Sequence, residues 1–247
     1  MKPIQRTSPA DICLNLVLTA ISPLQTLVDQ PGVTHEFCNR QAMLILRNDG
    51  FTPYADFFLQ HTKELNLGVS WADKGWKNVH HYFDPCSGKG LWTSAGAIES
   101  FKIYYQMASA AATQSDLNKA VFFLGAAAHL VQDLCVPHHA RAKLFCGHQH
   151  YEHWVQQHFA EYAVGAQGAY NEGQTPDSLI LHNAHTAADF LDWATNEAGE
   201  AKFGKVTEHL LALAQRSTAG LFRQFACEVL KIEEKPGFKN IVKVTVA

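Results

Sequence analysis

The sequence lacks the marks of several large protein classes. It has no run of roughly 18 apolar residues, which a membrane-spanning helix needs. Its net charge of −3 leaves no excess of basic side chains for binding duplex nucleic acid. Charged residues make up only 17% of the chain and hydrophobic residues 47%. This balance excludes intrinsic disorder and indicates a globular chain with a large buried core.

Cysteine pairs of the CxxC type are also missing, so the thiolate clusters of structural zinc sites are not expected. The sequence does not select a disulfide pairing among its six cysteines. We interpret them as small buried apolar side chains. They are Cys13, Cys38, Cys86, Cys135, Cys146 and Cys227.

The hydrophobic spacing predicts one all-α domain of about eight helices over residues 35–231. Gly68 is expected to end the second helix, and Ser115-Asp116 to cap the helix that begins at Leu117. Residues 68–92 show no helical period and are expected to form a functional loop. The predicted helices cover residues 35–46, 54–67, 95–112, 117–135, 150–164, 175–196 and 205–231.

Both ends of the chain are expected to lie outside this domain. Residues 232–247 form a tail whose last part alternates like a short strand. Residues 1–34 form an N-terminal extension, in which basic residues precede the apolar run 12–21 as in a secretory signal. Asp11 and Asn15 depart from that pattern. A cleaved signal or pro-segment, an uncleaved extension and a first helix all stay open, as do secretion and a cytoplasmic location.

The densest group of chemically active side chains lies between Phe123 and Trp154, which holds six histidines. His129 and Asp133 are four residues apart, so on a helix they lie one turn apart on the same face. His148 and Glu152 repeat this spacing. Imidazole and carboxylate ligands without thiolate are typical of catalytic zinc sites.

A further histidine, His139, lies between the two pairs and follows Pro137, which cannot continue a helix interior. A single histidine on an apolar helix is most often a packed or surface residue, and one such pair arises easily by chance. Two pairs with a histidine at the bend between them favour a metal site. The neighbouring His80, His138, His150 and His153 are expected to be bystanders.

The same stretch resembles the zinc-dependent bacterial phospholipase C family, including its alpha-toxin branch. The central pattern is FxLGxxxHxxxDxxxPxHA at residues 122–140, followed by a GHxxxYE-like spacing at 147–152. Supporting matches are ELNLGVSWAD at 64–73, HYFDP at 81–85 and AQRSTAGLFRQF at 214–225.

This resemblance implies a helical domain around three clustered zinc ions. It assigns His81, His129 and Asp133 to one ion. Asp133 bridges to another ion, whose remaining ligands are His35 and the free amino terminus of the mature chain. Family members begin with a tryptophan about ten residues before that histidine, whereas residues 1–70 contain none. Two to three zinc ions are therefore expected.

The resemblance assigns His139, His148 and Glu152 to the remaining ion. A separate carboxylate orients the attacking water as general base. Asp73 in GVSWAD is the favoured match, and Asp56 in PYADFF is the alternative.

Other positions have two interpretations each. Asp84 either forms a turn or orients a ligand histidine. Trp71 and Trp76 either bind a choline head group by cation–π contact or anchor the loop by packing.

The implied function is a phospholipase C that releases diacylglycerol and a phosphorylated head group at a membrane surface, acting as a monomer. One alternative is a single-strand nuclease or nucleotidase with a similar three-zinc core. That family usually has Asp at the position of Glu152 and another sequence before its bend histidine. The other alternative is a non-catalytic relative that keeps the metal cluster for structure or binding.

Overall fold

The computed structural model describes residues 32–93, 96–170 and 175–233. Over these residues the chain is all-α, as the sequence predicts, and no strand is found there apart from an isolated bridge between Asp84 and Lys89. The helices are α2 (Val33–Asn48), α3 (Thr52–Gln60), α4 (Thr62–Ala72), α5 (Ala97–Thr113), α6 (Leu117–Asp133), α7 (His148–His158), α8 (Pro176–Ala188) and α9 (Glu200–Gln224).

Short turns of tighter or wider helix connect or extend these elements. They are η1 (Gly75–His81), η2 (Leu91–Thr93), η3 (His139–Arg141), η4 (Phe159–Tyr162), η5 (Leu191–Trp193) and the π-helical η6 (Phe225–Val229).

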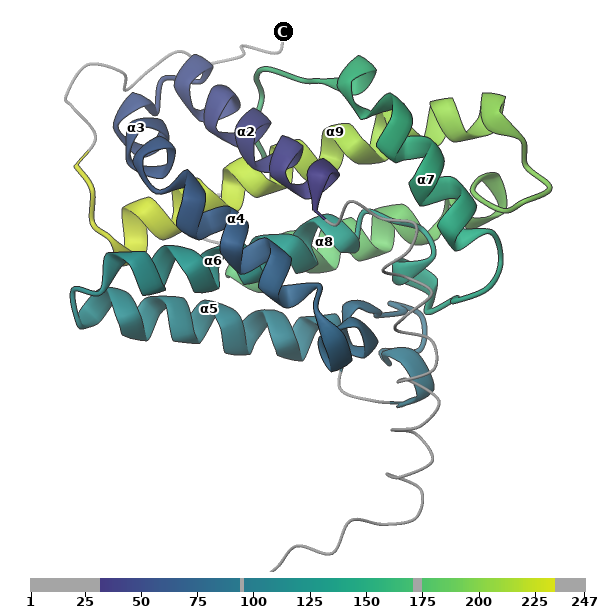
Figure 1. Ribbon diagram of the computed structural model, residues 1–247, viewed down its shortest axis with the longest axis horizontal. Helices are drawn as coiled ribbons and strands as arrows, with labels where there is room; N and C mark the ends of the chain where they lie inside the picture. The colour runs from purple at the N-terminus through teal and green to yellow at the C-terminus, as the bar shows by residue number, and fades with distance from the viewer. Residues whose placement is uncertain (1–31, 94–95, 171–174, 234–247) are drawn as a thin grey trace, which may run out of the picture.

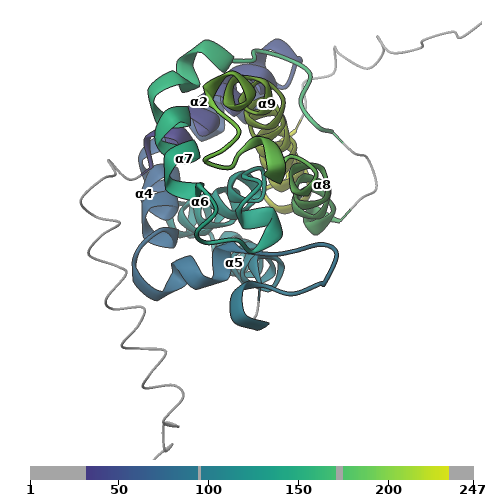
Figure 2. The same ribbon diagram turned by 90° about the vertical axis from the view of Figure 1, so that its right-hand side faces the viewer.

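Helix α6 lies at the centre of the fold. Every residue from Phe123 to Asp133 is buried, so this helix has no exposed face along that stretch. An α-helix that is buried all round needs neighbours on several sides. Helices α4 and α5 flank it, and the long α9 crosses the same core (Figures 1 and 2).

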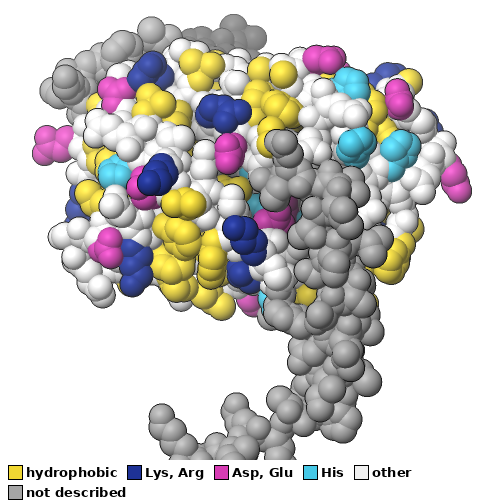
Figure 3. Space-filling view, in the orientation of Figure 1, with side chains coloured by type: hydrophobic (Ala, Val, Ile, Leu, Met, Phe, Trp, Pro, Cys, Tyr) yellow, Lys and Arg dark blue, Asp and Glu magenta, His cyan; other side chains and the backbone are white. Residues whose placement is uncertain are grey.

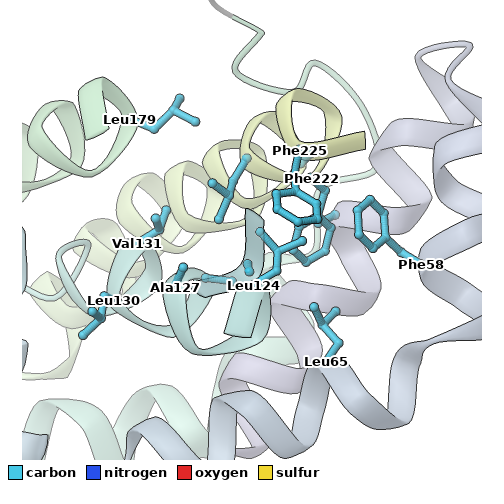
Figure 4. Close-up of a cluster of buried hydrophobic side chains, with 14 of the residues drawn as sticks. Phe58, Leu65, Leu124, Ala127, Leu130, Val131, Leu179, Phe222 and Phe225 are labelled. Atoms are coloured by element: carbon cyan, nitrogen blue, oxygen red, sulfur yellow. The ribbon is translucent and has the colours of Figure 1, made fainter. Parts of the chain in front are cut away.

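Aromatic and aliphatic side chains fill the core between these helices (Figure 4). Phe58 of α3 stacks on Phe222 of α9 with ring centroids 4.6 Å apart, and both rings are fully buried. Leu65 and Leu124 pack in the same cluster. Burial of this apolar surface is the main contribution to stability, at about 1.5–3 kcal/mol for each large side chain.

The prediction that Gly68 ends a helix is wrong, because Gly68 lies inside α4 where it crosses α6. A Cβ atom there would stand 1.8 Å from the carbonyl oxygen of Phe122. Gly125 of α6 is equally close to α4, since a Cβ atom on it would stand 2.1 Å from the carbonyl oxygen of Leu65. Two helices can approach this closely only where no side chain separates their backbones.

Several helix boundaries also differ from the prediction. The helix expected over 54–67 is divided at His61 into α3 and α4, and part of the expected loop 68–92 is helical. The helices expected to reach Val164 and Asn196 end earlier, and α9 begins before Lys205. The predicted cap is confirmed, because the Asp116 carboxylate accepts a hydrogen bond from the Lys119 backbone N–H at 3.2 Å.

Among the cysteines in the described residues, the expectation of burial holds for Cys38 and Cys135 but not for Cys86, Cys146 and Cys227, which are exposed, and Cys13 lies outside those residues. The interpretations of residues 1–31 and the strand expected in the tail lie outside the described residues.

Apolar side chains gather on the face shown in Figure 3 where α4, α5 and α6 run. Leu67 of α4 and Ile103 and Met107 of α5 are among the exposed large apolar residues. None of the described helices is long and apolar enough to cross a membrane.

The glycine crossing of α4 and α6 is testable by substitution. Gly125→Ala should lower the free energy of unfolding by about 1–3 kcal/mol, because the new methyl group meets backbone that cannot move alone. Gly204→Ala in α9 is the control, since its Cβ would meet side-chain atoms rather than backbone, the Tyr162 hydroxyl at 3.1 Å and the Trp154 ring at 3.8 Å, and alanine raises helix propensity. Urea unfolding of both variants compares them, and equal stability would contradict the crossing.

Candidate metal centre

The ends of several helices place the predicted ligands around one cavity of about 320 Å³. They meet on the side of the molecule where α7 lies (Figures 1 and 2). Helix α6 contributes two ligands from its last turns, and α7 contributes two from its first turns. The residues that line the cavity include His35, Asp73, His81, Asp133, His139, His148 and Glu152. His129 is not among them, but its ring nitrogen lies within 4.8 Å of ligand atoms of His35 and Asp133.

Asp133 is the centre of the first group of ligands. Its Oδ2 atom lies 2.7 Å from His81 Nδ1 and 3.2 Å from His129 Nε2. Its Oδ1 atom faces the other way and lies 3.4 Å from His35 Nε2. The two oxygens of this carboxylate therefore face different imidazoles, Oδ2 those of His81 and His129 and Oδ1 that of His35.

Glu152 and two histidines form the second group. His148 Nε2 lies 2.8 Å from Glu152 Oε1, one helical turn away on α7. His139 Nε2 lies 3.3 Å from the same oxygen and 2.9 Å from His148 Nε2.

Backbone carbonyls orient two of these imidazole rings. His81 Nε2 lies 3.1 Å from the carbonyl oxygen of Ala72, so its N–H donates there and leaves Nδ1 free toward Asp133. His139 Nδ1 lies 3.3 Å from the carbonyl oxygen of His81, so its N–H donates there and Nε2 faces Glu152. Metal-binding histidines are held by outer hydrogen bonds of this kind.

The charges of the cluster are strongly coupled. Burial acts to raise the pKa of Asp133, but the neighbouring imidazoles hold it well below its usual range. Burial likewise acts to raise the pKa of Glu152, and His148 and His139 lower it. Burial acts to lower the pKa of His139, but Asp133 and then Glu152 raise it to about 9. Both carboxylates are therefore ionised at neutral pH and available as ligands.

These residues fit a metal ion on chemical grounds. Asp133 Oδ2 is buried and has no hydrogen-bond partner, although imidazole nitrogens lie within 2.7–3.5 Å of it. A buried carboxylate oxygen left in this way is costly unless a cation satisfies it. Nitrogen and oxygen atoms that can bind a metal ion also converge within 4.8 Å in four overlapping groups, which are His35, His129 and Asp133; Asp73, His81 and His129; His81, Asp133 and His139; and His139, His148 and Glu152. This donor set suits zinc.

A comparison with protein families identifies the family to which the chain belongs. The family model described as zinc dependent phospholipase C matches residues 34–202, which is more than half of the chain. The chain belongs to the zinc dependent phospholipase C family. All the predicted ligands lie within the matched residues.

Two solved structures show the same fold. The alpha toxin from Clostridium absonum superposes with a TM-score of 0.73 at 17% sequence identity. An alpha-toxin of Clostridium perfringens, from avian strain SWCP, superposes with a TM-score of 0.69 at 20% identity. Each alignment covers 81% of this chain and 65% of the toxin chain. Among curated proteins, none matches the chain.

The structure separates the two carboxylates considered for the general base in this phospholipase C family member. Asp73 follows the last residue of α4, lines the cavity and places Oδ1 4.0 Å from His129 Nε2. Asp56 of α3 is half exposed and pairs with Arg47 at 2.6 Å. The residues that line the cavity include Asp73 and not Asp56.

The predicted head-group residue Trp71 does not line the cavity. Its ring packs against Tyr104, Phe122 and Phe123, with centroids 5.4–6.0 Å away. This position matches the packing interpretation. The other predicted residue, Trp76, lies in η1, and its side chain is outside the described part of the chain.

The histidines expected to be bystanders lie outside the groups of possible ligands among the described residues. His138 is buried, and its Nε2 lies 3.1 Å from the carbonyl oxygen of Cys146. His150 packs edge-on against Phe203. Asp84 accepts a hydrogen bond from the Cys86 backbone N–H at 3.0 Å, so it forms a turn.

Gln132, the residue before Asp133, was not predicted from the sequence as part of the site. Its side chain contacts the predicted ligand His35. Its Oε1 lies 2.8 Å from His35 Nδ1, and its Nε2 donates to Asn39 and to Thr218 at 3.0 and 3.1 Å. These two acceptors fix which end of the amide faces His35. His35 Nδ1 must then carry the proton, and Nε2 is free toward Asp133. No local spacing marks this residue, because its partners are 86 to 97 positions away.

Replacing Gln132 tests this outer contact. Gln132→Leu should weaken zinc binding at His35 by about 10–100-fold, because the imidazole loses the acceptor that fixes its tautomer. Gln132→Glu keeps an acceptor oxygen and should retain the ion. Zinc titration with a competing chelator measures both variants. Equal loss in the two, or loss at His139 and His148 instead, would contradict this role.

Proposed function

We propose that this chain is a zinc-dependent phosphodiester hydrolase that cleaves phospholipids to diacylglycerol and a phosphorylated head group. The observation that carries the proposal is the convergence of two histidine–carboxylate groups around one cavity. Membership of the zinc dependent phospholipase C family supports the same reaction.

The first group would hold one ion through His81, His129 and the Oδ2 atom of Asp133. Its Oδ1 atom, with His35, would hold another. The ion beside His35 has fewer ligands among the described residues, because each imidazole nitrogen binds one metal ion and His129 already binds the ion beside His81. We therefore expect it to bind more weakly.

The second group would hold an ion through His139, His148 and Glu152. Two strongly bound zinc ions and a weaker third are the expected content. When bound, clustered zinc ions neutralise phosphate oxygens and lower the pKa of water toward ~7.

Asp73 is the proposed general base. Its carboxylate is 32% exposed and faces the cavity beside His129, so its Oδ1 can orient a water molecule and accept a proton from it. General bases of this kind act by position within hydrogen-bond reach of the proton they remove.

The apolar part of the cavity favours a lipid over a nucleotide. Helices α7 and α9 line it with Val155, Leu210, Leu211 and Ala214. Nucleotide binding by stacking needs accessible aromatic faces. The aromatic side chains among the described lining residues are Tyr82, which stacks on His139 with ring centroids 4.6 Å apart, and Tyr151, which packs edge-on against Phe203, so their faces are already in contact with other rings.

Metal content and product release together test the proposal. Full-length protein loaded with zinc is assayed for zinc per chain and for diacylglycerol release from short-chain phospholipids. Two to three zinc ions with diacylglycerol release support it. Hydrolysis of single-stranded DNA without lipid cleavage would favour the nuclease alternative, and bound zinc without turnover the non-catalytic one.

Asp73→Asn should lower kcat by about 10²–10⁴-fold, because the amide cannot accept the proton. Zinc content should stay unchanged, which separates a general base from a zinc ligand. Asp56→Asn is the matched control, since that residue is exposed and paired with Arg47. Steady-state kinetics on both variants decide between them. Full activity of Asp73→Asn would exclude this role.

Zinc loading should release a proton at pH 7. Asp133 and Glu152 raise the pKa of His139 to about 9 in the metal-free protein, so its imidazole is protonated at pH 7 and must lose that proton to bind zinc. Zinc affinity should therefore rise with pH up to about 9.

Calorimetry in buffers of different ionisation enthalpy counts the released protons. His153→Gln, on the exposed side of α7, is the control and should keep the release. If zinc affinity does not change between about pH 6 and about pH 9, His139 is not a zinc ligand.

A further inference from the structure

The motif AQRSTAGLFRQF at residues 214–225 contributes no ligand to the metal centre, although most of it lies in α9 and its Ala214 lines the cavity. Its polar residue Thr218, one helical turn after Ala214, is fully buried. The Thr218 hydroxyl donates to the carbonyl oxygen of Ala214 at 2.7 Å. A hydroxyl has one proton, so Thr218 can only accept a further hydrogen bond, and Gln132 Nε2 donates it at 3.1 Å.

The amides that also contact Gln132 do not fix its orientation by themselves. Gln132 donates to Asn39, and Asn39 donates to Asn66 of α4, at 3.0 and 3.1 Å. A side-chain amide has a donor at one end and an acceptor at the other, so turning all of them over reverses each bond without losing it. Asn66 is only half-buried, so water can complete either arrangement.

The two arrangements put the proton of a neutral His35 on different nitrogens. With Gln132 Oε1 facing it at 2.8 Å, His35 Nδ1 carries the proton and Nε2 keeps its lone pair. With the Gln132 amide turned over, His35 Nδ1 has to accept, and the proton moves to Nε2. A protonated Nε2 cannot bind a metal ion, so only the first arrangement is ready for zinc.

Asp133 and Thr218 act in opposite directions on this choice. His35 Nε2 lies 3.4 Å from Asp133 Oδ1, so a proton on Nε2 would be shared with a buried carboxylate, which favours the turned arrangement before an ion binds. In that arrangement the Gln132 oxygen would face the Thr218 hydroxyl. The hydroxyl would then have to give up its 2.7 Å bond to Ala214 in order to donate.

From these contacts we infer that Thr218 is a positioning residue, which selects through Gln132 the tautomer of His35 that can bind zinc. Its hydroxyl keeps the Nε2 lone pair of His35 directed toward Asp133 Oδ1, where the weaker ion of the proposed function would lie. The inference rests on that proposed function in taking His35 as a zinc ligand, and it explains how a side chain on α9 acts on a ligand of α2.

Nitrogen NMR of the metal-free full-length protein with isotope-labelled histidine distinguishes the two tautomers, at about pH 8, where an ordinary imidazole is neutral. His35→Asn identifies the signals of His35. The unchanged protein should carry the proton on Nδ1. Thr218→Val should move it to Nε2 in most molecules, because the amides can then turn over. Thr218→Ala removes the same hydroxyl with a smaller side chain and should give the same shift.

Zinc titration with a competing chelator gives the second measurement. Thr218→Val should weaken the most weakly bound ion roughly tenfold, because apparent affinity falls with the fraction of molecules in the competent state. The more tightly bound ions should be unaffected. Thr218→Ser keeps the hydroxyl and should keep both the tautomer and the affinity.

A second substitution at Gln132 separates this role from a loss of packing. In Thr218→Val/Gln132→Glu the carboxylate has no N–H to give His35, so the proton should return to Nδ1. Ser217→Ala is the matched control on α9. Its hydroxyl is also buried, but it bonds to Asn183 and to the Ala214 carbonyl oxygen, so the His35 tautomer should not change.

A proton that stays on Nδ1 in both Thr218→Val and Thr218→Ala would overturn this inference, as would an equal shift in Ser217→Ala. Zinc content that is unchanged in His35→Asn would overturn it as well. Because the tautomer is read without metal, the inference can fail while zinc-loaded protein still cleaves phospholipid. Zinc-loaded protein without lipid cleavage would instead overturn the proposed reaction and leave the tautomer result standing.

Discussion

The buried carboxylate of Asp133 is the constraint on which the rest of this structure depends. An isolated carboxylate in a protein interior costs several kcal/mol, so it needs positive charge or hydrogen bonds on all sides. Histidines from three other parts of the chain supply this surrounding: His35 of α2, His81 of η1 and His139 of η3. The same geometry that stabilises the anion places ligand atoms on both of its oxygens. The imidazoles around Asp133 therefore both stabilise its buried charge and supply the ligand atoms for a metal ion.

Close packing of the helices supplies the precision that this cluster needs. Because Gly68 and Gly125 let α4 and α6 touch through their backbones, the end of α4 lies beside the last turns of α6. The carbonyl oxygen of Ala72 can then accept from His81, and Asp73 reaches the cavity. A packing feature of the core thus orients one proposed ligand and positions the proposed base. Substitutions at the crossing would disturb the site without contacting it.

Local spacing explains how much of the site could be predicted from the sequence. His129 with Asp133, and His148 with Glu152, are pairs within one helix, so their geometry follows from 3.6 residues per turn. The sequence favoured Asp73 over Asp56 as a local match but kept both, because the two follow similar short patterns. The path of α4 is what brings Asp73 to the cavity and leaves Asp56 paired with Arg47.

The sequence alone is enough to predict the helical class, the two histidine–carboxylate pairs and the resemblance to a zinc phospholipase C. All of these follow from spacing along one helix or from a local motif. Which groups share a site depends on the tertiary structure, in which Gln132 contacts His35 and Asp73 lines the cavity whereas Asp56 does not. The tertiary structure also decided that Gly68 continues a helix rather than ending it. Contacts between residues far apart in the chain depend on how helices pack, and local sequence patterns carry no record of that packing.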